Sequence, residues 1–219
     1  MSAHRFFLAS PLPAAEKGAR VVLPLAPEDA HHLVSVLRVR EGEVVEVVSP
    51  DGESAWSARI EAIAPVVEAT LLEPLVRVRH PRVTLVQGVA KGEKMDAIVR
   101  QAVEIGADEI VPVLFARSVV KLDGRKRAER GERWRRIARS AAEQAHRDVL
   151  PLVHDPATLT EALPLLAEHD EVVVLWEDAR DVGLESALAS WVAAEDPRVA
   201  LVVGPEGGLA ADEVAALES

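Results

Sequence analysis

The stretch VALVVGPEGGLAADEVAAL, from Val199 to Leu217, decides the fold predicted for the second half of the chain. Its first residues, Val199 to Val203, form an apolar run typical of a strand buried on both faces. The run stops at the glycine-rich turn Gly204–Gly208, and an Ala-rich segment that favours a helix follows. A strand that leads through such a turn into a helix usually holds an anionic or polar group on backbone N–H groups. The sequence therefore predicts a ligand-binding loop late in the chain.

The composition of this turn narrows the kind of ligand. A P-loop needs Lys and then Ser or Thr after its last glycine, and neither follows Gly208. The dinucleotide fingerprint belongs on the first strand of a domain, whereas this turn follows the last strand that the sequence shows. Gly-Pro-Glu-Gly-Gly places backbone-permissive residues around the fixed Pro205, which predicts a rigid loop that a ligand can approach closely. Two alternatives remain, a plain turn and a phosphate-binding turn of a nucleotide-binding enzyme.

Strands and helices alternate on the N-terminal side of this stretch, back to Pro81. The segments VTLVQGVA, EIVPVLF, EVVVLW and VALVVG are nearly continuous apolar runs, as expected for buried strands. The segment 91–108 predicts a helix with one apolar face and with Gly106 as its stop. A second long helix carries an apolar stripe made of Trp134, Ile137, Ala138, Ala141, Ala142 and Ala145. This alternation predicts an α/β domain with a parallel sheet.

The first seventy residues follow a different pattern of short strands and tight turns. The predicted strands include 19–25, 43–49 and 54–64, with one short helix that begins at Pro27. Together with the turn at Pro50-Asp51-Gly52, they predict a small antiparallel β-barrel. Proline residues interrupt both patterns near residues 73–82, so we predict a barrel domain at 1–73 and an α/β domain at 74–219.

Charge is distributed unevenly along the chain. The formal net charge of −11 argues against a nucleic-acid partner, but Lys121–Arg147 contains ten Lys or Arg against four Asp or Glu, a local net of +6. Such segregation can form a basic RNA-binding patch on an acidic body. A solvated helix face with internal ion pairs is the alternative. Aromatic residues make up 3% with no Tyr, so a target base would be held by Arg planes and backbone rather than on a stacking platform.

Composition also excludes several chemistries. The chain has no Cys, which removes disulfides, thiolate zinc sites and cysteine nucleophiles. Its seven His form no metal-ligand pair at helical spacing, so we expect no metal. No apolar run approaches the ~18 residues of a membrane helix, and the start lacks the apolar core of a signal peptide. We therefore expect a cytoplasmic protein without a membrane partner.

Five stretches taken together resemble the ribosomal RNA small subunit methyltransferase E family of the SPOUT class. In chain order they are HHLVSVLRVREGEVVEVVSPDG, KGEKMDAIVRQAVEIGADEIVPV, RSVVK, RWRRIARSAAEQAHRDVLP and VVGPEGGLAADEV. The resemblance covers nearly the whole chain and implies a PUA-like β-barrel followed by an α/β domain with a C-terminal trefoil knot. It also implies a homodimer that uses S-adenosyl-L-methionine to methylate N3 of a uridine in 16S ribosomal RNA of the small subunit.

The same resemblance implies where the cofactor lies. The implied contacts are Leu175 and the loop residues Gly204, Pro205, Glu206, Gly207 and Gly208. Glu206 either contacts the cofactor through its backbone or begins the following helix. The family continues with a strand and a Leu-Gly-x-Arg-Ile-Leu-Arg-x-Glu-Thr motif that closes the knot, so we expect the encoded protein to continue beyond Ser219. A non-catalytic RNA-binding relative with an incomplete cofactor pocket is the alternative.

Helical spacing and the resemblance together indicate residues for chemistry and for RNA. Glu143 and Arg147 share a helix face, either as an i,i+4 salt bridge or with Arg147 stabilising the oxyanion that develops on uridine. They are the candidate catalytic residues. The candidate RNA-binding residues are Arg38, Arg40, Arg117, Lys121, Arg133, Arg136 and Arg139. The alanines of the second long helix either belong to the core or allow close helix approach in a homodimer.

Overall fold

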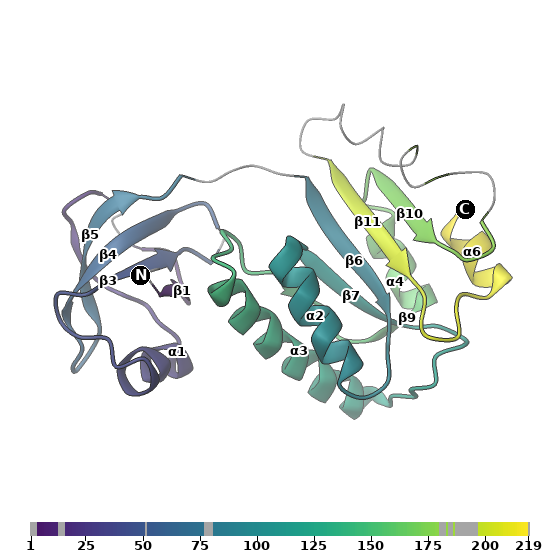
Figure 1. Ribbon diagram of the computed structural model, residues 1–219, viewed down its shortest axis with the longest axis horizontal. Helices are drawn as coiled ribbons and strands as arrows, with labels where there is room; N and C mark the ends of the chain where they lie inside the picture. Colours follow the sequence, from purple (N-terminus) through teal and green to yellow (C-terminus); the bar gives the residue numbers. More distant parts are fainter. Residues whose placement is uncertain are drawn as a thin grey trace. The chain divides into compact units, whose positions relative to one another are not determined.

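The computed structural model describes residues 4–12, 16–50, 52–76, 81–179, 183, 186 and 197–218. These residues fall into two compact units, drawn in Figure 1. The first unit comprises the described residues of 1–78 and 142–150, and the second those of 79–141 and 151–219. The predicted boundary near residues 73–82 includes 77–80, which lie outside the described residues. The sequence patterns do not predict the place of 142–150 in the first unit.

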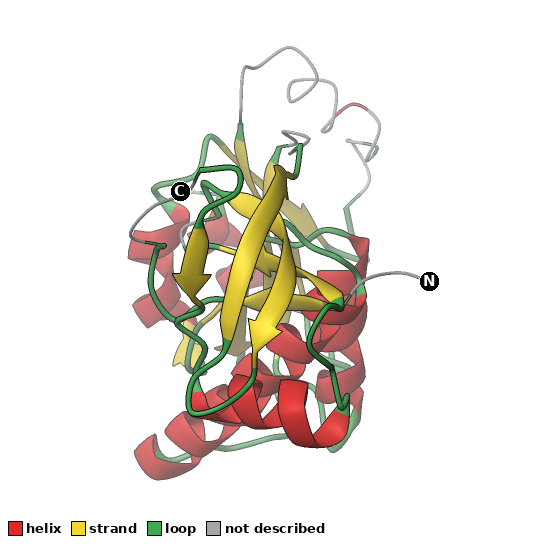
Figure 2. Ribbon diagram, turned by 90° about the vertical axis from the view of Figure 1, so that its left-hand side faces the viewer, coloured by secondary structure: helices red, strands yellow, loops and turns green. Residues whose placement is uncertain are grey.

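The first unit is built on a five-stranded sheet of order β1-β3-β4-β5-β2, whose strands are yellow in Figure 2. They are β1 (Arg5–Phe7), β2 (Arg20–Val22), β3 (Val44–Val48), β4 (Ala55–Ala62) and β5 (Glu68–Pro74). β1 pairs with β3 in parallel, and the other pairs are antiparallel. The sheet is therefore mixed, and the purely antiparallel prediction is wrong. The long segment between β1 and β3 includes a helix, which provides the crossover that a parallel pair needs.

Apolar alternation along these strands builds the core of the first unit. Val45 and Val47 of β3 are buried on the same face, as are Ala58 and Ile60 of β4. Helix α1 (Pro27–His31) begins at the predicted proline and continues as a π-helical turn, η1 (His32–Val36). Leu33 of this turn is completely buried in the same core. Burial of one such side chain stabilises the fold by about 1.5–3 kcal/mol.

The second unit contains a sheet in which every pair is parallel, as predicted. Its order is β10-β11-β6-β7-β8, and β9 also pairs with β7. The strands are β6 (Arg82–Gly88), β7 (Glu109–Leu114), β8 (Leu152–Val153), β9 (Ala157–Thr158), β10 (Glu171–Leu175) and β11 (Arg198–Val203). The four apolar runs that the sequence marks as strands correspond to β6, β7, β10 and β11.

Helices cover this sheet on both faces. They are α2 (Lys94–Ile105), α3 (Gly124–Gln144), α4 (Leu159–Leu166) and α6 (Ala211–Leu217). Leu166 of α4 and Val214 of α6 pack with Val86 and Val202 of the sheet. In Figure 1, α2 lies in front of β7, whereas α4 lies behind the sheet. α2 ends at the predicted Gly106, whose φ of 120° suits a left-handed cap.

The apolar stripe of α3 belongs to the core. Trp134, Ala138, Ala141 and Ala142 are each at most 3% exposed within the chain itself. Ala138, Ala141 and Ala142 therefore belong to the core, whereas Ile137 and Ala145 of the stripe are only half-buried. Within the part of the chain that the structure describes, no helix is long and apolar enough to cross a membrane.

Strand order creates a switch point in this sheet. β6 is the first strand of the unit, and α2 leads from it to β7 on one side. β11, the last strand described, pairs with β6 on the other side. The loops after β6 and β11 therefore leave the same edge in opposite directions. In open α/β sheets, ligands bind in the crevice outside the carboxyl ends of the strands at such a point.

Candidate active site

The loop Gly204–Gly208 leaves β11 and lies directly against the end of β6. A Cβ atom placed on Gly88 would lie 2.3 Å from the backbone nitrogen of Pro205 and 2.7 Å from the carbonyl carbon of Gly204. The buried side-chain amide of Gln87 donates to the carbonyl of Gly88 at 2.9 Å and to that of Gly204 at 3.5 Å. Only a glycine at position 88 lets the two backbones meet. Neither Gln87 nor Gly88 is among the site residues that the sequence predicts, although a Gln inside an apolar strand is a signal.

Each glycine of the loop is crowded by different protein atoms. A Cβ on Gly204 would lie 3.1 Å from Leu209 Cγ, and one on Gly207 would lie 3.0 Å from the Arg117 carbonyl oxygen. Gly208 has a φ of +73°, and its Cβ would lie 2.2 Å from Glu177 Oε1. Side chains at Gly204 and Gly207 would press on their neighbours, one at Gly208 would push the exposed Glu177 carboxylate aside, and Gly208 also needs its left-handed conformation. The predicted rigid loop therefore has a packing reason at each glycine.

Glu206 fastens the loop to the start of α2. Its Oε1 accepts a hydrogen bond from the Lys91 N–H at 3.3 Å and lies 3.5 Å from Lys94 Nζ. The pKa of the Glu206 carboxyl is lowered most by a hydrogen bond from the Glu206 backbone N–H. The Lys91 N–H and the Lys94 ammonium group lower this pKa further. Because both its side chain and its backbone N–H are engaged in this way, its backbone carbonyl is the part of Glu206 that remains for a ligand.

The start of α6 depends on Glu213 instead of Glu206. The buried Glu213 carboxylate accepts from the Ala210 N–H at 2.9 Å, at the first turn of α6. Its other oxygen accepts from the Ala116 N–H at 2.6 Å, in the loop after β7. The helix begins at Ala211, so the reading in which Glu206 begins it is wrong.

Arg117 is the predicted RNA-binding residue that contacts the glycine loop. It is exposed, and its Nη1 donates to the carbonyl of Gly207 at 3.3 Å. Lys121 follows on the same loop and is also exposed. Leu175 ends β10 and pairs in register with Val203, the residue before the loop. Its side chain is 43% exposed, which leaves an apolar surface next to the loop.

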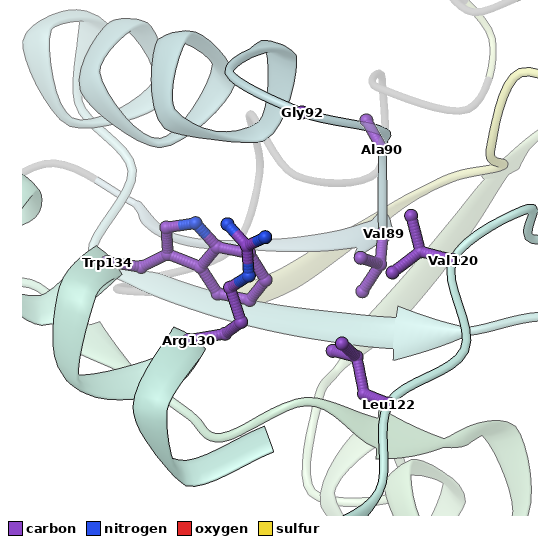
Figure 3. A pocket seen from close by; sticks show the side chains of 7 residues that line it. All are labelled: Val89, Ala90, Gly92, Val120, Leu122, Arg130 and Trp134. Atoms are coloured by element: carbon purple, nitrogen blue, oxygen red, sulfur yellow. The ribbon is translucent and has the colours of Figure 1, made fainter. Parts of the chain in front are cut away.

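A small pocket lies between the loops after β6 and β7 (Figure 3). Its cavity volume is about 20 Å³, which is room for one water molecule. The residues that line it are Val89, Ala90, Gly92, Val120, Leu122, Arg130 and Trp134. Asp96 of α2 accepts from the Trp134 indole N–H at 3.0 Å and from Arg133 Nε at 3.0 Å. The hydrogen bond from Arg133 holds the pKa of Asp96 below its usual value, against the opposing effect of burial.

The structure divides the remaining predicted residues between the two units. Arg147 is buried in the first unit, where its carbonyl accepts from Arg5 Nη1 at 2.9 Å, and Glu143 is half-buried there. Arg38 and Arg40 are exposed in the first unit, and Arg38 has a φ of 55°. Arg136 and Arg139 lie on α3 in the second unit. The described residues contain no cluster of three metal-ligating side chains.

Comparison with known proteins defines the class. A family model described as an RNA methyltransferase domain matches residues 78–219, and an RNA methyltransferase PUA domain matches residues 25–65. The fold and the glycine loop are thus those of an RNA methyltransferase. The ribosomal RNA small subunit methyltransferase E of Bacillus subtilis is 34% identical over 191 residues, which are 85% of this chain and 75% of the relative. The chain belongs to the ribosomal RNA small subunit methyltransferase E family.

Further relatives agree with this assignment. The enzyme of the same description from Mycobacterium bovis is 34% identical over 87% of this chain and 72% of its own length. A crystal structure of the Neisseria gonorrhoeae enzyme bound to S-adenosyl methionine superposes with a TM-score of 0.78 at 29% identity. It covers 99% of this chain and 86% of the solved one. A putative methyltransferase from Legionella pneumophila with the same cofactor bound has a TM-score of 0.77 at 25% identity and covers 100% of this chain and 86% of the solved one.

Proposed function

We propose that this chain transfers a methyl group from S-adenosylmethionine to N3 of a uridine in 16S ribosomal RNA of the small subunit. The observation that carries the proposal is the glycine loop, which is folded onto Gly88 at the switch point of a parallel sheet. The cofactor-bound relative from Neisseria gonorrhoeae supports the methyl donor. The names of the Bacillus and Mycobacterium relatives support a ribosomal RNA substrate. The choice of uridine N3 rests on the resemblance to the family.

The residues at the loop fit this cofactor. Leu175 offers an exposed apolar side chain for the adenosine, and it pairs in register with Val203, the residue before the loop. A Cβ on Gly208 would lie 2.2 Å from Glu177 Oε1, so the exposed Glu177 side chain would have to move away from the loop. Bound S-adenosylmethionine supplies an electrophilic methyl group on its sulfonium. The chain then has to hold the cofactor, align the acceptor nitrogen and exclude water.

Arg117 is the cation we propose for charge stabilisation at the acceptor. Uridine N3 must lose its imide proton, and the negative charge that results spreads onto the base oxygens. Arg117 contacts the carbonyl of Gly207 and remains exposed, so its guanidinium lies beside the loop. Fixed positive groups aimed at a developing oxyanion are an effective means of lowering such barriers. Arg147, on the helix face that it shares with Glu143, is the other candidate for this role that the family resemblance implies.

Three further features are proposed on the same family resemblance. They are a trefoil knot in the second unit, a homodimer, and a cytoplasmic location, where small ribosomal subunits are found. The SAM-bound relatives support the general fold with TM-scores above 0.75.

The test is methyl transfer to small ribosomal subunits from a strain that lacks this enzyme, with mass spectrometry of the nucleosides. We expect 3-methyluridine in the small-subunit RNA. Gly208→Ala should weaken S-adenosylhomocysteine binding, because its Cβ would displace the Glu177 carboxylate from its place beside the loop. Gly42→Ala is the matched control, since Gly42 also has a positive φ of +88° but would meet no atom within 4 Å. RNA binding without any transfer would contradict the proposal and favour a non-catalytic RNA-binding protein.

A further inference from the structure

Glutamate carboxylates support the glycine loop Gly204–Gly208 and the start of the helix that follows it. Glu206, within the loop, accepts a hydrogen bond from the Lys91 N–H and pairs with Lys94. Glu213, in the first turn of α6, is buried, and each of its two oxygens accepts from a backbone N–H. The protein itself therefore uses both of these carboxylates, and neither is left over for a ligand.

Glu177 is a further carboxylate at the loop, and it is not engaged in this way. It follows the end of β10 by two residues, is exposed, and has no hydrogen bond or ion pair to any residue that the structure describes. Its carboxylate lies against Gly208, because a Cβ placed on that glycine would be 2.2 Å from Glu177 Oε1 and 3.2 Å from Oε2. The absence of a side chain at Gly208 thus lets an unpaired negative charge lie directly beside the loop.

Other side chains next to the loop are positively charged. Arg117 donates to the carbonyl of Gly207, exposed Lys121 follows on the same segment, and Lys94 faces Glu206. Such cations suit the phosphates of RNA, but they repel any ligand that is itself a cation. S-adenosylmethionine carries a positive sulfonium, so its binding at this loop gains from a negative charge placed among these cations.

We propose that Glu177 is the counter-charge of the sulfonium and gives the loop a preference for S-adenosylmethionine over S-adenosylhomocysteine. The end of β10 then serves the cofactor twice, since Leu175 offers apolar surface and Glu177 offers charge. When the methyl group leaves, sulfur keeps the electron pair of the broken C–S bond and becomes neutral. The product loses its attraction to Glu177, which favours its exchange for a new methyl donor. This inference rests on the proposed function, which places the cofactor at the loop.

Binding of three cofactor forms separates the charge of Glu177 from its shape. S-adenosylmethionine and sinefungin carry a positive group at or next to the sulfur position, whereas S-adenosylhomocysteine does not. Glu177→Gln keeps the size of the side chain and removes its charge. Calorimetry should show that the affinities for the two cationic forms fall about fivefold relative to that for S-adenosylhomocysteine, as expected for one partly exposed charge pair. Added salt should shrink this difference, because it screens exposed charges.

Asp178→Asn is the matched control for Glu177→Gln. Asp178 is the next residue and is also exposed, but the three atoms nearest to a Cβ on Gly208 all belong to Glu177. The control should therefore leave the preference for the cationic forms nearly unchanged, and melting temperatures without ligand check that both variants fold. The inference is overturned if Glu177→Gln alters all three affinities by the same factor, or if Asp178→Asn has an equal effect. Failure of the unsubstituted protein to bind any of the three would contradict the proposed function as well.

Discussion

Single residues at the edge of the second sheet determine whether the site can form. Gly88 is the clearest case, because the backbone of another loop occupies the space where its side chain would be. The loop Gly204–Gly208 is readable from the sequence, since its residues are adjacent and of an unusual kind. The role of Gly88 cannot be predicted in this way, because its side chain would collide with the backbone nitrogen of Pro205, which lies 117 residues further along the chain.

Gly88→Ala should destabilise the protein by about 1–3 kcal/mol, the usual cost of overpacking a tight contact. The added methyl group would force β6 away from Pro205 and disturb the loop. Gly124→Ala is the control, because a Cβ there meets no atom within 4 Å. Urea unfolding of both variants measures the difference. Equal stability of the two would mean that the contact between Gly88 and Pro205 is absent in solution.

Acid sensitivity is the second prediction at this scale, and it concerns Glu109. His154 Nε2 lies 2.6 Å from the Glu109 carboxylate, and Thr84 donates to it at 3.0 Å. The hydrogen bond with His154 is the largest of the effects that lower the pKa of Glu109 from 4.5. The hydrogen bond from Thr84 and the charges of His154 and His169 lower this pKa further, whereas burial of the carboxyl raises it. The pKa of Glu109 is lower in the folded protein than in the unfolded chain, so the ionised carboxylate stabilises the fold at pH values above the unfolded pKa. This stabilisation is lost as the pH falls below about 4.5 and the carboxyl becomes protonated.

Glu109→Gln should therefore be less stable at pH 7 but lose less stability between pH 7 and pH 3. Glu129→Gln, in an exposed pair with Arg125, should keep the pH dependence of the unsubstituted protein. Denaturant unfolding at several pH values gives both curves. Parallel curves for Glu109→Gln and the unsubstituted protein would contradict the assignment.

At the scale of elements, most strands and helices follow from apolar periodicity, whereas their pairing does not. The four buried strands of the second unit and the stop of α2 at Gly106 agree with the sequence patterns. The parallel pairing of β1 with β3 and the partner of Arg133 were not predictable. Both depend on residues far apart in sequence, and Arg133 in particular reads as a free basic residue until Asp96 is placed beside it.

Arg5 of β1 is the side chain that holds residues 146–148 in the first unit. It is 9% exposed, and it forms salt bridges to Glu46 at 2.7 Å and to Asp148 at 2.9 Å. It also donates to the carbonyl oxygens of His146 and Arg147. His146 has a φ of 52°, which turns the chain after α3. This set of contacts is the physical reason why the segment after α3 packs with the first unit.

Arg5→Ala should destabilise the protein by about 3–5 kcal/mol, since it leaves buried acceptors and the half-buried Glu46 without their cation. Arg20→Ala should cost less than about 1 kcal/mol, because the pair of Arg20 with Glu68 is largely exposed. Thermal and urea unfolding of the two variants give the comparison. A similar small loss for both would show that the buried pairing contributes little.

At the scale of the whole molecule, the proposed homodimer makes a prediction about mass. The monomer has a mass of 23.6 kDa, and sedimentation at micromolar concentration should give twice this value. The buried Ala138, Ala141 and Ala142 belong to the core, so the contact must use other residues. Leucine substitutions there should lower the melting temperature without a specific effect on dimer dissociation. A monomeric mass would contradict the proposed assembly.

The course of the chain through its two units has a consequence during synthesis. The first unit takes up residues 142–150, so it is incomplete when the ribosome has made only residues 1–78. Until then Arg5 lacks the partners that residues 146–148 provide. The missing piece follows after 72 more residues, about 4–14 s later at the usual ~5–20 residues per second. The N-terminal unit must wait until residues 79–141 of the second unit have been made, so co-translational folding cannot proceed strictly from the first unit to the second.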